Sequence, residues 1–188
     1  MTSSANDGHT LWLLRHAKTV ADPPLGRSDF ERVLTPRGRR DATALGHLFG
    51  GQGKGLGPAL KGVPRPAVAL VSAAARTSAT AELVLAEMDD PPEQRLVDDL
   101  YYAEPEEVLD LLRALPDTVR AAMVVGHNPT ALALSQGLLA HADAAGRSLT
   151  AQIGLPTCAL AVLRFDVPHW ADVGAGTATL LALLRPPY

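Results

Sequence analysis

Short apolar runs alternate with segments of helical periodicity along this chain, and this alternation restricts its fold more than any other feature of the sequence. Six short segments are predicted strands, at 11–14, 67–71, 95–97, 122–125, 158–165 and 177–184, and those at 11–14 and 122–125 are continuously apolar, as buried strands are. Between them, apolar spacing and helix-starting prolines predict helices over 36–49, 77–87, 105–116 and 129–139. Strands that alternate with helices are typical of a three-layer α/β/α fold with a mainly parallel central sheet. The last two runs, joined by one loop, predict an antiparallel hairpin at the edge of that sheet.

The 188 residues suit a single domain, because no second independent core follows any linker-like stretch. Residues 1–9 are small and polar and are expected to form a flexible N-terminal tail, while the Gly- and Pro-rich segment 50–66 is expected to be a surface loop. Neither a secretion signal nor an apolar run of roughly 18 to 20 residues occurs, which favours a cytoplasmic protein. The net charge of −3 argues against nucleic-acid and anionic membrane partners. Cys158, the single cysteine, lies in an apolar stretch and is expected to be a buried structural thiol.

Polar residues follow three of the predicted strands at the point where each strand ends. Arg15 and His16 follow the first run, Ser72 and Arg76 follow the second, and His127 follows the run at 122–125. Parallel strands place their carboxyl ends at one edge of the sheet, where ligands bind in such folds. The sequence therefore predicts that two arginines and two histidines converge on one pocket.

This set of side chains suits phosphoryl chemistry. The planar guanidinium fork matches phosphate oxygens and stays charged, so the pair Arg15 and Arg76 favours a phosphoryl group over a carboxylate. No Cys-x-x-Cys or His-Glu-x-x-His motif occurs, so we expect neither a metal nor another cofactor. A neutral imidazole can then serve as the nucleophile, and His16 fits this role. Each histidine could also be a merely hydrogen-bonded structural group, but their combination with two arginines favours the site. The other histidines lack such neighbours and are expected on the surface or in helices: His9, His47, His141 and His169.

Four motifs follow one another between residues 11 and 130. They are Leu-Arg-His-Ala-Lys-Thr at 14–19, Asp-x-x-Arg-x-Leu-Thr-x-Arg-Gly at 29–38, Ser-Ala-Ala-Ala-Arg-Thr-Ser-Ala-Thr-Ala at 72–81 and Val-Gly-His-Asn-Pro at 125–129. In this order they resemble the motifs of the histidine phosphatase superfamily, which has the phosphoglycerate mutase-like fold, and in particular its short SixA-like phosphohistidine phosphatase branch. Ala17 replaces the usual glycine of the family's Arg-His-Gly signature. Beyond Leu138 only the strand pattern supports the resemblance.

The resemblance implies a metal-independent phosphatase that forms a phosphohistidine intermediate on His16. It implies that Arg15 and Arg76 clamp the phosphoryl oxygens and that His127 stabilises charge in the transferring group. Water then releases phosphate.

Two further residues in the first two motifs are expected to contact substrate: Arg32 and Thr19. For Arg32, an exposed ion pair with Asp29 or Glu31 is an equally good interpretation.

The general acid is the least defined part of the prediction. Asp99 is our candidate, with Asp98 and Glu104 nearby, and a carboxyl group there would need a raised pKa to donate a proton near neutrality. The alternative is that these acids solvate a loop or cap the helix that begins near Pro105. If no acid is needed, the leaving group must depart easily, as the imidazole of a phosphohistidine does.

The expected substrate is therefore a phosphohistidine-bearing protein. A phosphatase of small phosphate esters, such as sugar phosphates or nucleotides, is the nearest alternative. A mutase would need a larger lid to shield the intermediate from water. A phosphate-binding module without turnover should lack His16 or Arg76, and both are present. In a pure interaction scaffold, the arginines would be surface groups. The oligomeric state leaves no reliable trace in one sequence.

Overall fold

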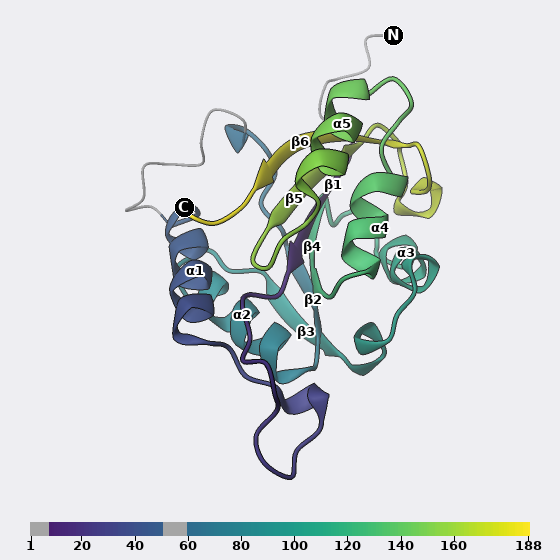
Figure 1. Cartoon of the computed structure of the whole chain (residues 1–188). Coiled ribbons are helices and arrows are strands. Elements are labelled where there is room, and N and C mark those ends of the chain that lie inside the picture. Colours follow the sequence, from purple (N-terminus) through teal and green to yellow (C-terminus); the bar gives the residue numbers. More distant parts are fainter. Residues whose placement is uncertain (1–7, 51–59) are drawn as a thin grey trace, which may run out of the picture.

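The computed structural model describes residues 8–50 and 60–188, and its strands form one mixed sheet (Figure 1). In spatial order the strands are β3 (Glu93–Val97), β2 (Val68–Ser72), β4 (Ala121–Gly126), β1 (His9–Arg15), β5 (Leu160–Phe165) and β6 (Ala178–Leu184). The first four run parallel to one another, while β5 is antiparallel to β1 and β6 is antiparallel to β5. The predicted mainly parallel sheet with an antiparallel edge is thus confirmed.

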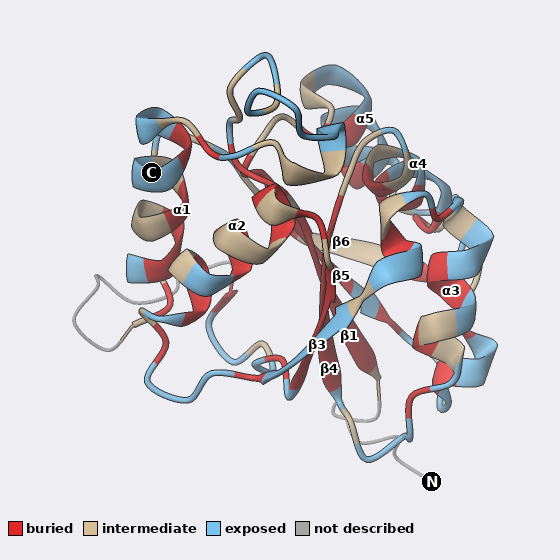
Figure 2. Cartoon of the chain, turned by 90° about the horizontal axis from the view of Figure 1, so that it is seen from below, coloured by how far each residue is buried: buried red, intermediate tan, exposed pale blue. Residues whose placement is uncertain are grey.

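Helices cover both faces of this sheet, which Figure 2 shows nearly edge-on. One face carries α1 (Pro36–His47) and α2 (Ala75–Leu85). The other carries α3 (Pro105–Arg113), α4 (Thr130–Gly137) and α5 (Ala144–Ile153). The predicted three-layer arrangement is therefore present.

Alternating residues of the central strands fill two separate cores. In β1, Leu11 and Leu13 face the core under α3 and α4, whereas Trp12 and Leu14 face the core under α1 and α2. Successive side chains of a strand point to opposite faces. A strand covered by helices on both sides is therefore apolar at every position, which explains the uninterrupted runs in the sequence.

His9 does not belong to a flexible tail, nor does it lie on the surface, so both predictions were wrong at this residue. It begins β1 and is fully buried. Its ring packs 4.7 Å from that of Trp170, and its Nε2 lies 3.1 Å from the carbonyl oxygen of Pro168, within hydrogen-bonding distance. The sequence pattern missed this because a polar residue at a strand end can be buried when a distant loop supplies its partners. Residues 1–7 of the predicted tail lie outside the described residues.

The segment 50–66 is only partly described, since 51–59 lie outside the described residues. Lys61 and Arg65 are exposed, but Leu60 is buried in the core under α1 and α2. Cys158 is buried as predicted, and burial raises the pKa of its thiol to about 12. This residue does not begin the last-but-one strand, because its φ of 62° is left-handed rather than extended.

The helix α5 had not been predicted. Asp143 caps it by accepting a hydrogen bond from the Gly146 amide at 2.9 Å. An aspartate followed by helix-forming residues was the available signal. Among the described residues, no helix combines the length and the apolar character needed to cross a membrane.

Candidate active site

The carboxyl ends of β1, β2 and β4 bring the two predicted histidines together. β4 lies between β1 and β2, and Arg15 pairs with Gly126 at the end of the β1–β4 ladder. The backbone continues this register for one more residue, since the His16 amide donates to the Gly126 carbonyl at 3.1 Å. The rings of His16 and His127 consequently lie 5.4 Å apart. The predicted meeting of the strand ends is thus observed for this pair.

His16 is held as a neutral imidazole with a defined proton position. Its ring is only 6% exposed, and Nδ1 lies 2.8 Å from the Ala17 carbonyl oxygen. A carbonyl can only accept, so Nδ1 carries the proton and Nε2 keeps its lone pair. Burial and the charges of Arg76 and Arg15 lower the pKa of this imidazole to about 4. His16 therefore presents an unprotonated Nε2 at neutral pH.

A chain of hydrogen bonds fixes the segment that carries His16 to α2. The Ala17 amide donates to Thr80 Oγ1 at 2.9 Å, and that hydroxyl donates to the Arg76 carbonyl at 2.6 Å. On the other side, Gly38 lies so close to Lys18 that a side-chain carbon at this glycine would come within 2.1 Å of the Lys18 carbonyl oxygen. Only glycine permits this approach, which packs the start of α1 against the residues that follow His16.

His127 is the second neutral imidazole of the site. Its Nε2 shares a hydrogen bond of 2.9 Å with Ser72 Oγ at the end of β2. Burial, followed by the charges of Arg76 and His16, lowers the pKa of His127 to about 3. Its Nδ1 is buried and has no hydrogen-bond partner in the described part of the chain. A buried polar atom without a partner is uncommon, and a bound ligand is one way in which such an atom is satisfied.

Arg76 lies in the first turn of α2 and is 5% exposed. Asp29 in the short 3-10 helix η1 (Asp29–Glu31) holds it twice, through its carbonyl oxygen at 2.8 Å from Nη1 and through Oδ2 at 3.1 Å from Nη2. Tyr101 completes the group, because its hydroxyl donates to Asp29 Oδ2 at 2.8 Å and its ring lies 5.4 Å from the Arg76 guanidinium carbon. The Tyr101 ring also meets the His127 ring edge-on at 5.5 Å. Arg76 is thereby oriented by a carboxylate and an aromatic ring that sequence reasoning had not assigned to the site.

Arg15 is anchored by the segment between α5 and β5. Its Nη1 donates to the Leu155 carbonyl at 2.9 Å, and the Asn128 side chain donates to the same oxygen at 3.1 Å. The Nε atoms of Arg15 and Arg76 are both buried without a hydrogen-bond partner in the described residues. Two unsatisfied guanidinium donors beside two neutral imidazoles make a site that suits an oxyanion.

Comparisons with known proteins agree with this geometry. No protein-family model matches the chain. An uncharacterised protein of Mycobacterium tuberculosis is 34% identical over 175 residues, which cover 92% of this chain and 99% of that protein. A structure from Nakamurella multipartitia, assigned as the phosphohistidine phosphatase SixA, is 29% identical with a TM-score of 0.74, covering 96% of this chain and 98% of that one. A structure from Agrobacterium tumefaciens with the same assignment is 29% identical with a TM-score of 0.71, covering 95% and 98%. This chain belongs to the histidine phosphatase superfamily.

The chain is accordingly a phosphatase with the phosphoglycerate mutase-like fold. The remaining residues that the sequence had placed in the site of this histidine phosphatase are Arg32, Thr19 and Asp99. Arg32 Nε lies 3.4 Å from Asp29 Oδ1, so the ion pair considered from the sequence is formed, and the charge of Arg32 also helps to lower the pKa of His16. The backbone of Thr19 pairs with Leu34, and its side chain makes no hydrogen bond to a described residue. A substrate contact by Arg32 or Thr19 remains a prediction.

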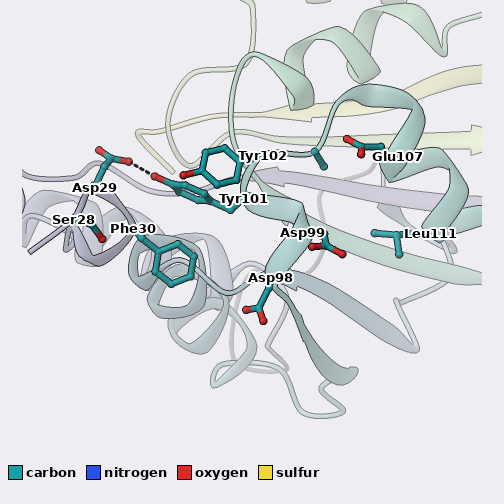
Figure 3. A pocket seen from close by; sticks show the side chains of 10 residues that line it. Ser28, Asp29, Phe30, Asp98, Asp99, Tyr101, Tyr102, Glu107 and Leu111 are labelled. Atoms are coloured by element: carbon teal, nitrogen blue, oxygen red, sulfur yellow. Dashed lines mark hydrogen bonds between the residues drawn. The ribbon is translucent and has the colours of Figure 1, made fainter.

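Asp99 is exposed in the 3-10 helix η3 (Asp98–Tyr101), whereas Asp29 is the carboxylate that contacts Arg76. In Figure 3, the Asp29 carboxylate meets the Tyr101 hydroxyl, while the Asp99 carboxylate lies apart from them. The hydrogen bond from Tyr101 and the nearby arginines lower the pKa of Asp29. Asp29 is therefore a charged partner of the arginine and not a proton donor near neutrality.

The capping interpretation is confirmed for Glu104. Together with Glu107 it forms a capping box at the start of α3, in which Glu107 accepts from the Glu104 amide at 2.7 Å. Within residues 8–50 and 60–188, no group of three or more His, Cys, Asp or Glu side chains is arranged to hold a metal ion.

Proposed function

We propose that this histidine phosphatase hydrolyses phosphohistidine on protein substrates without a metal, using His16 as its nucleophile. The supporting observation is the buried, neutral His16 ring, whose Nδ1 is committed to Ala17 and whose Nε2 remains free to attack. The similarity to structures assigned as SixA phosphohistidine phosphatases supports the substrate class.

In the first step, Nε2 of His16 attacks phosphorus while the bond from phosphorus to the leaving group breaks. Arg15 and Arg76 neutralise the phosphoryl oxygens, and His127 stabilises the charge that these oxygens share. In the second step, water attacks the phosphoryl group on His16, the bond from phosphorus to nitrogen breaks, and phosphate leaves.

The ionised state of Asp29 bears on the choice of substrate. The alcohol group of an alkyl phosphate ester leaves as an alkoxide unless a proton donor protonates it. Asp29 cannot be this donor while Tyr101 and Arg76 stabilise its charged form. An imidazole leaves from a phosphoramidate more readily, so phosphohistidine suits the site. Small phosphate esters remain the second candidate because Asp99 lines a cavity next to Tyr101, from which it could serve as the acid.

The test is to trap the intermediate. Brief incubation of the protein with a 32P-labelled phosphohistidine protein, followed by a quench in base, should leave label on the unmodified chain because phosphohistidine survives base. His16→Ala should carry no label and should release phosphate at least 1,000-fold more slowly, the order of magnitude for loss of a nucleophile. His47→Ala is the matched control, since His47 is exposed and its one ion pair with a described residue is that with Glu87.

Full activity in His16→Ala would refute the assignment of His16 as the nucleophile. A higher kcat/KM for sugar phosphates or nucleotides than for phosphohistidine protein would refute the proposal that phosphohistidine is the substrate.

A further inference from the structure

A cavity of about 700 Å³ lies beside the phosphate site (Figure 3). Three short segments line it: η1, the turn formed by η3 and the residues that follow it, and one side of α3. Nothing in the proposed reaction uses this space, yet its volume falls in the range of ligand pockets.

Tyr101 and Asp29 form the wall that the cavity shares with the phosphate site. Both residues line the cavity, and both also contact Arg76. The Tyr101 ring further meets the ring of His127. Since an extended chain advances roughly 3.3 to 3.6 Å per residue, a side chain one or two positions from a phosphorylated residue can reach this cavity.

The cavity is strongly acidic. Asp98, Asp99 and Glu107 line it, and no lysine, arginine or histidine is among the described residues that line it. All three carboxylates are exposed, and in the described part of the chain Asp98 and Asp99 form no ion pair or side-chain hydrogen bond. Unlike Asp29, whose charge is matched by Arg76 and Arg32, these two carboxylates are unmatched.

Aromatic rings line the same cavity. Tyr102 is 84% exposed, an unusual degree for a tyrosine, and its ring meets that of Tyr101 edge-on at 4.4 Å. Phe30 packs on the Tyr101 ring at 5.0 Å. Aromatic faces beside carboxylates attract a cation, and the apolar stem of a long basic side chain can pack on the rings and on Leu111.

We propose that this cavity binds a lysine or arginine side chain of the phosphorylated polypeptide, close to the phosphorylated residue. The proposal rests on the proposed function for the phosphoryl group itself and adds that the enzyme selects substrates with a basic neighbour.

Two pairs of synthetic peptides test this selectivity. Within each pair the peptides differ only in lysine or glutamine two positions from the phosphorylated residue, which is phosphohistidine in one pair and phosphotyrosine in the other. The quantity to measure is the ratio of kcat/KM for the lysine peptide to that for the glutamine peptide. We expect a ratio of about 10 for the unmodified protein, equivalent to about 1.4 kcal/mol, since aromatic and acidic groups act together on the same cation.

The variant Asp98→Asn/Glu107→Gln should reduce this ratio below about 3. It leaves Asp99, the predicted acid, in place, and glutamine can still complete the capping box of α3. The matched control is Asp89→Asn/Asp90→Asn, which removes the same charge from exposed residues that precede β3, at the opposite end of the strand from Asp98. This control should keep the ratio of the unmodified protein.

The outcomes separate this inference from the proposed function. If the enzyme turns over only the phosphotyrosine peptides, phosphohistidine is refuted as its substrate. The ratio of kcat/KM between the lysine and glutamine peptides of that pair still tests whether the cavity binds a basic side chain. Equal kcat/KM for lysine and glutamine peptides, equal effects of the two double variants, or no turnover of any peptide would overturn the inference.

Discussion

The chemistry of this site depends on where single protons lie, and two histidines of the chain show how their surroundings decide this. Burial and neighbouring arginines lower the pKa of His16, so its ring is neutral at pH 7. His169 is exposed beside Asp117, and the hydrogen bond and charge of this carboxylate raise its pKa. The same type of side chain is thus neutral in one place and paired with a carboxylate in the other.

The lowered pKa of His16 predicts an unusual pH profile. A histidine with an ordinary pKa near 6.5 would be only about 3% neutral at pH 5. With a pKa of about 4, His16 stays roughly 90% neutral there, and protonation removes this proposed nucleophile only as the pH falls through 4. We therefore expect kcat/KM for an aryl phosphate, corrected for the substrate's own ionisation, to fall less than twofold between pH 7 and pH 5.

NMR titration of the His16 ring in the free protein provides a second measurement. A loss of kcat/KM centred at pH 6 to 7 that the substrate's ionisation does not explain, together with a ring titrating there, would contradict this prediction.

At the scale of elements, Arg76 is held where η1, the first turn of α2 and η3 meet. Asp29 makes this junction, because it contacts Arg76 from α2 and Tyr101 from η3 while belonging to η1. The strand ends were predictable from the sequence, since an apolar run that stops at Arg15 and His16 marks a boundary. The position of η1 was not predictable from the sequence. The path of residues 17–35 depends on tertiary contacts, such as the contact of Gly38 with Lys18.

This junction predicts that Asp29→Asn weakens catalysis without unfolding the protein. The variant loses the charged contact with Arg76 Nη2 but keeps the carbonyl contact with Nη1, so Arg76 is less precisely placed and remains nearby. We expect kcat/KM for an aryl phosphate to fall about tenfold, equivalent to about 1.4 kcal/mol. The melting temperature should change little, because the Asp29 side chain is 51% exposed.

Glu31→Gln provides the control for this experiment, because Glu31 lies in the same short helix but pairs with Arg27. Unchanged kinetics in Asp29→Asn, or an equal loss in Glu31→Gln, would show that the junction does not position Arg76.

At the scale of the whole molecule, the periodic strands and helices could be predicted from the sequence, whereas the cavity could not. The alternation of apolar runs and helices determined the layers, and chain topology then brought residues 16 and 127 together. The cavity beside Tyr101 was not predictable, because its walls come from η1, η3 and α3, and their separation is a result of packing. Asp99 was predicted as the general acid from its position in the sequence. Its exposure and its distance from the histidines depend on how η3 turns, which the sequence pattern does not reveal.

A molecule that holds unsatisfied guanidinium donors in its native state should be stabilised by the anion they suit. Anion binding to the folded state alone stabilises it by RT ln(1 + [L]/Kd), about 1.4 kcal/mol at ten times Kd. For a chain of this size, inorganic phosphate at that concentration should raise the melting temperature by about 3 to 6 °C. Arg15→Gln, which leaves the buried Arg76 intact, should abolish most of this increase, while Arg65→Gln at an exposed position should keep it. Scanning fluorimetry measures the melting temperatures of the two variants and of the unmodified protein, with sodium chloride of equal ionic strength as the reference. An equal increase in chloride, or an undiminished increase in Arg15→Gln, would mean that phosphate stabilises the fold elsewhere.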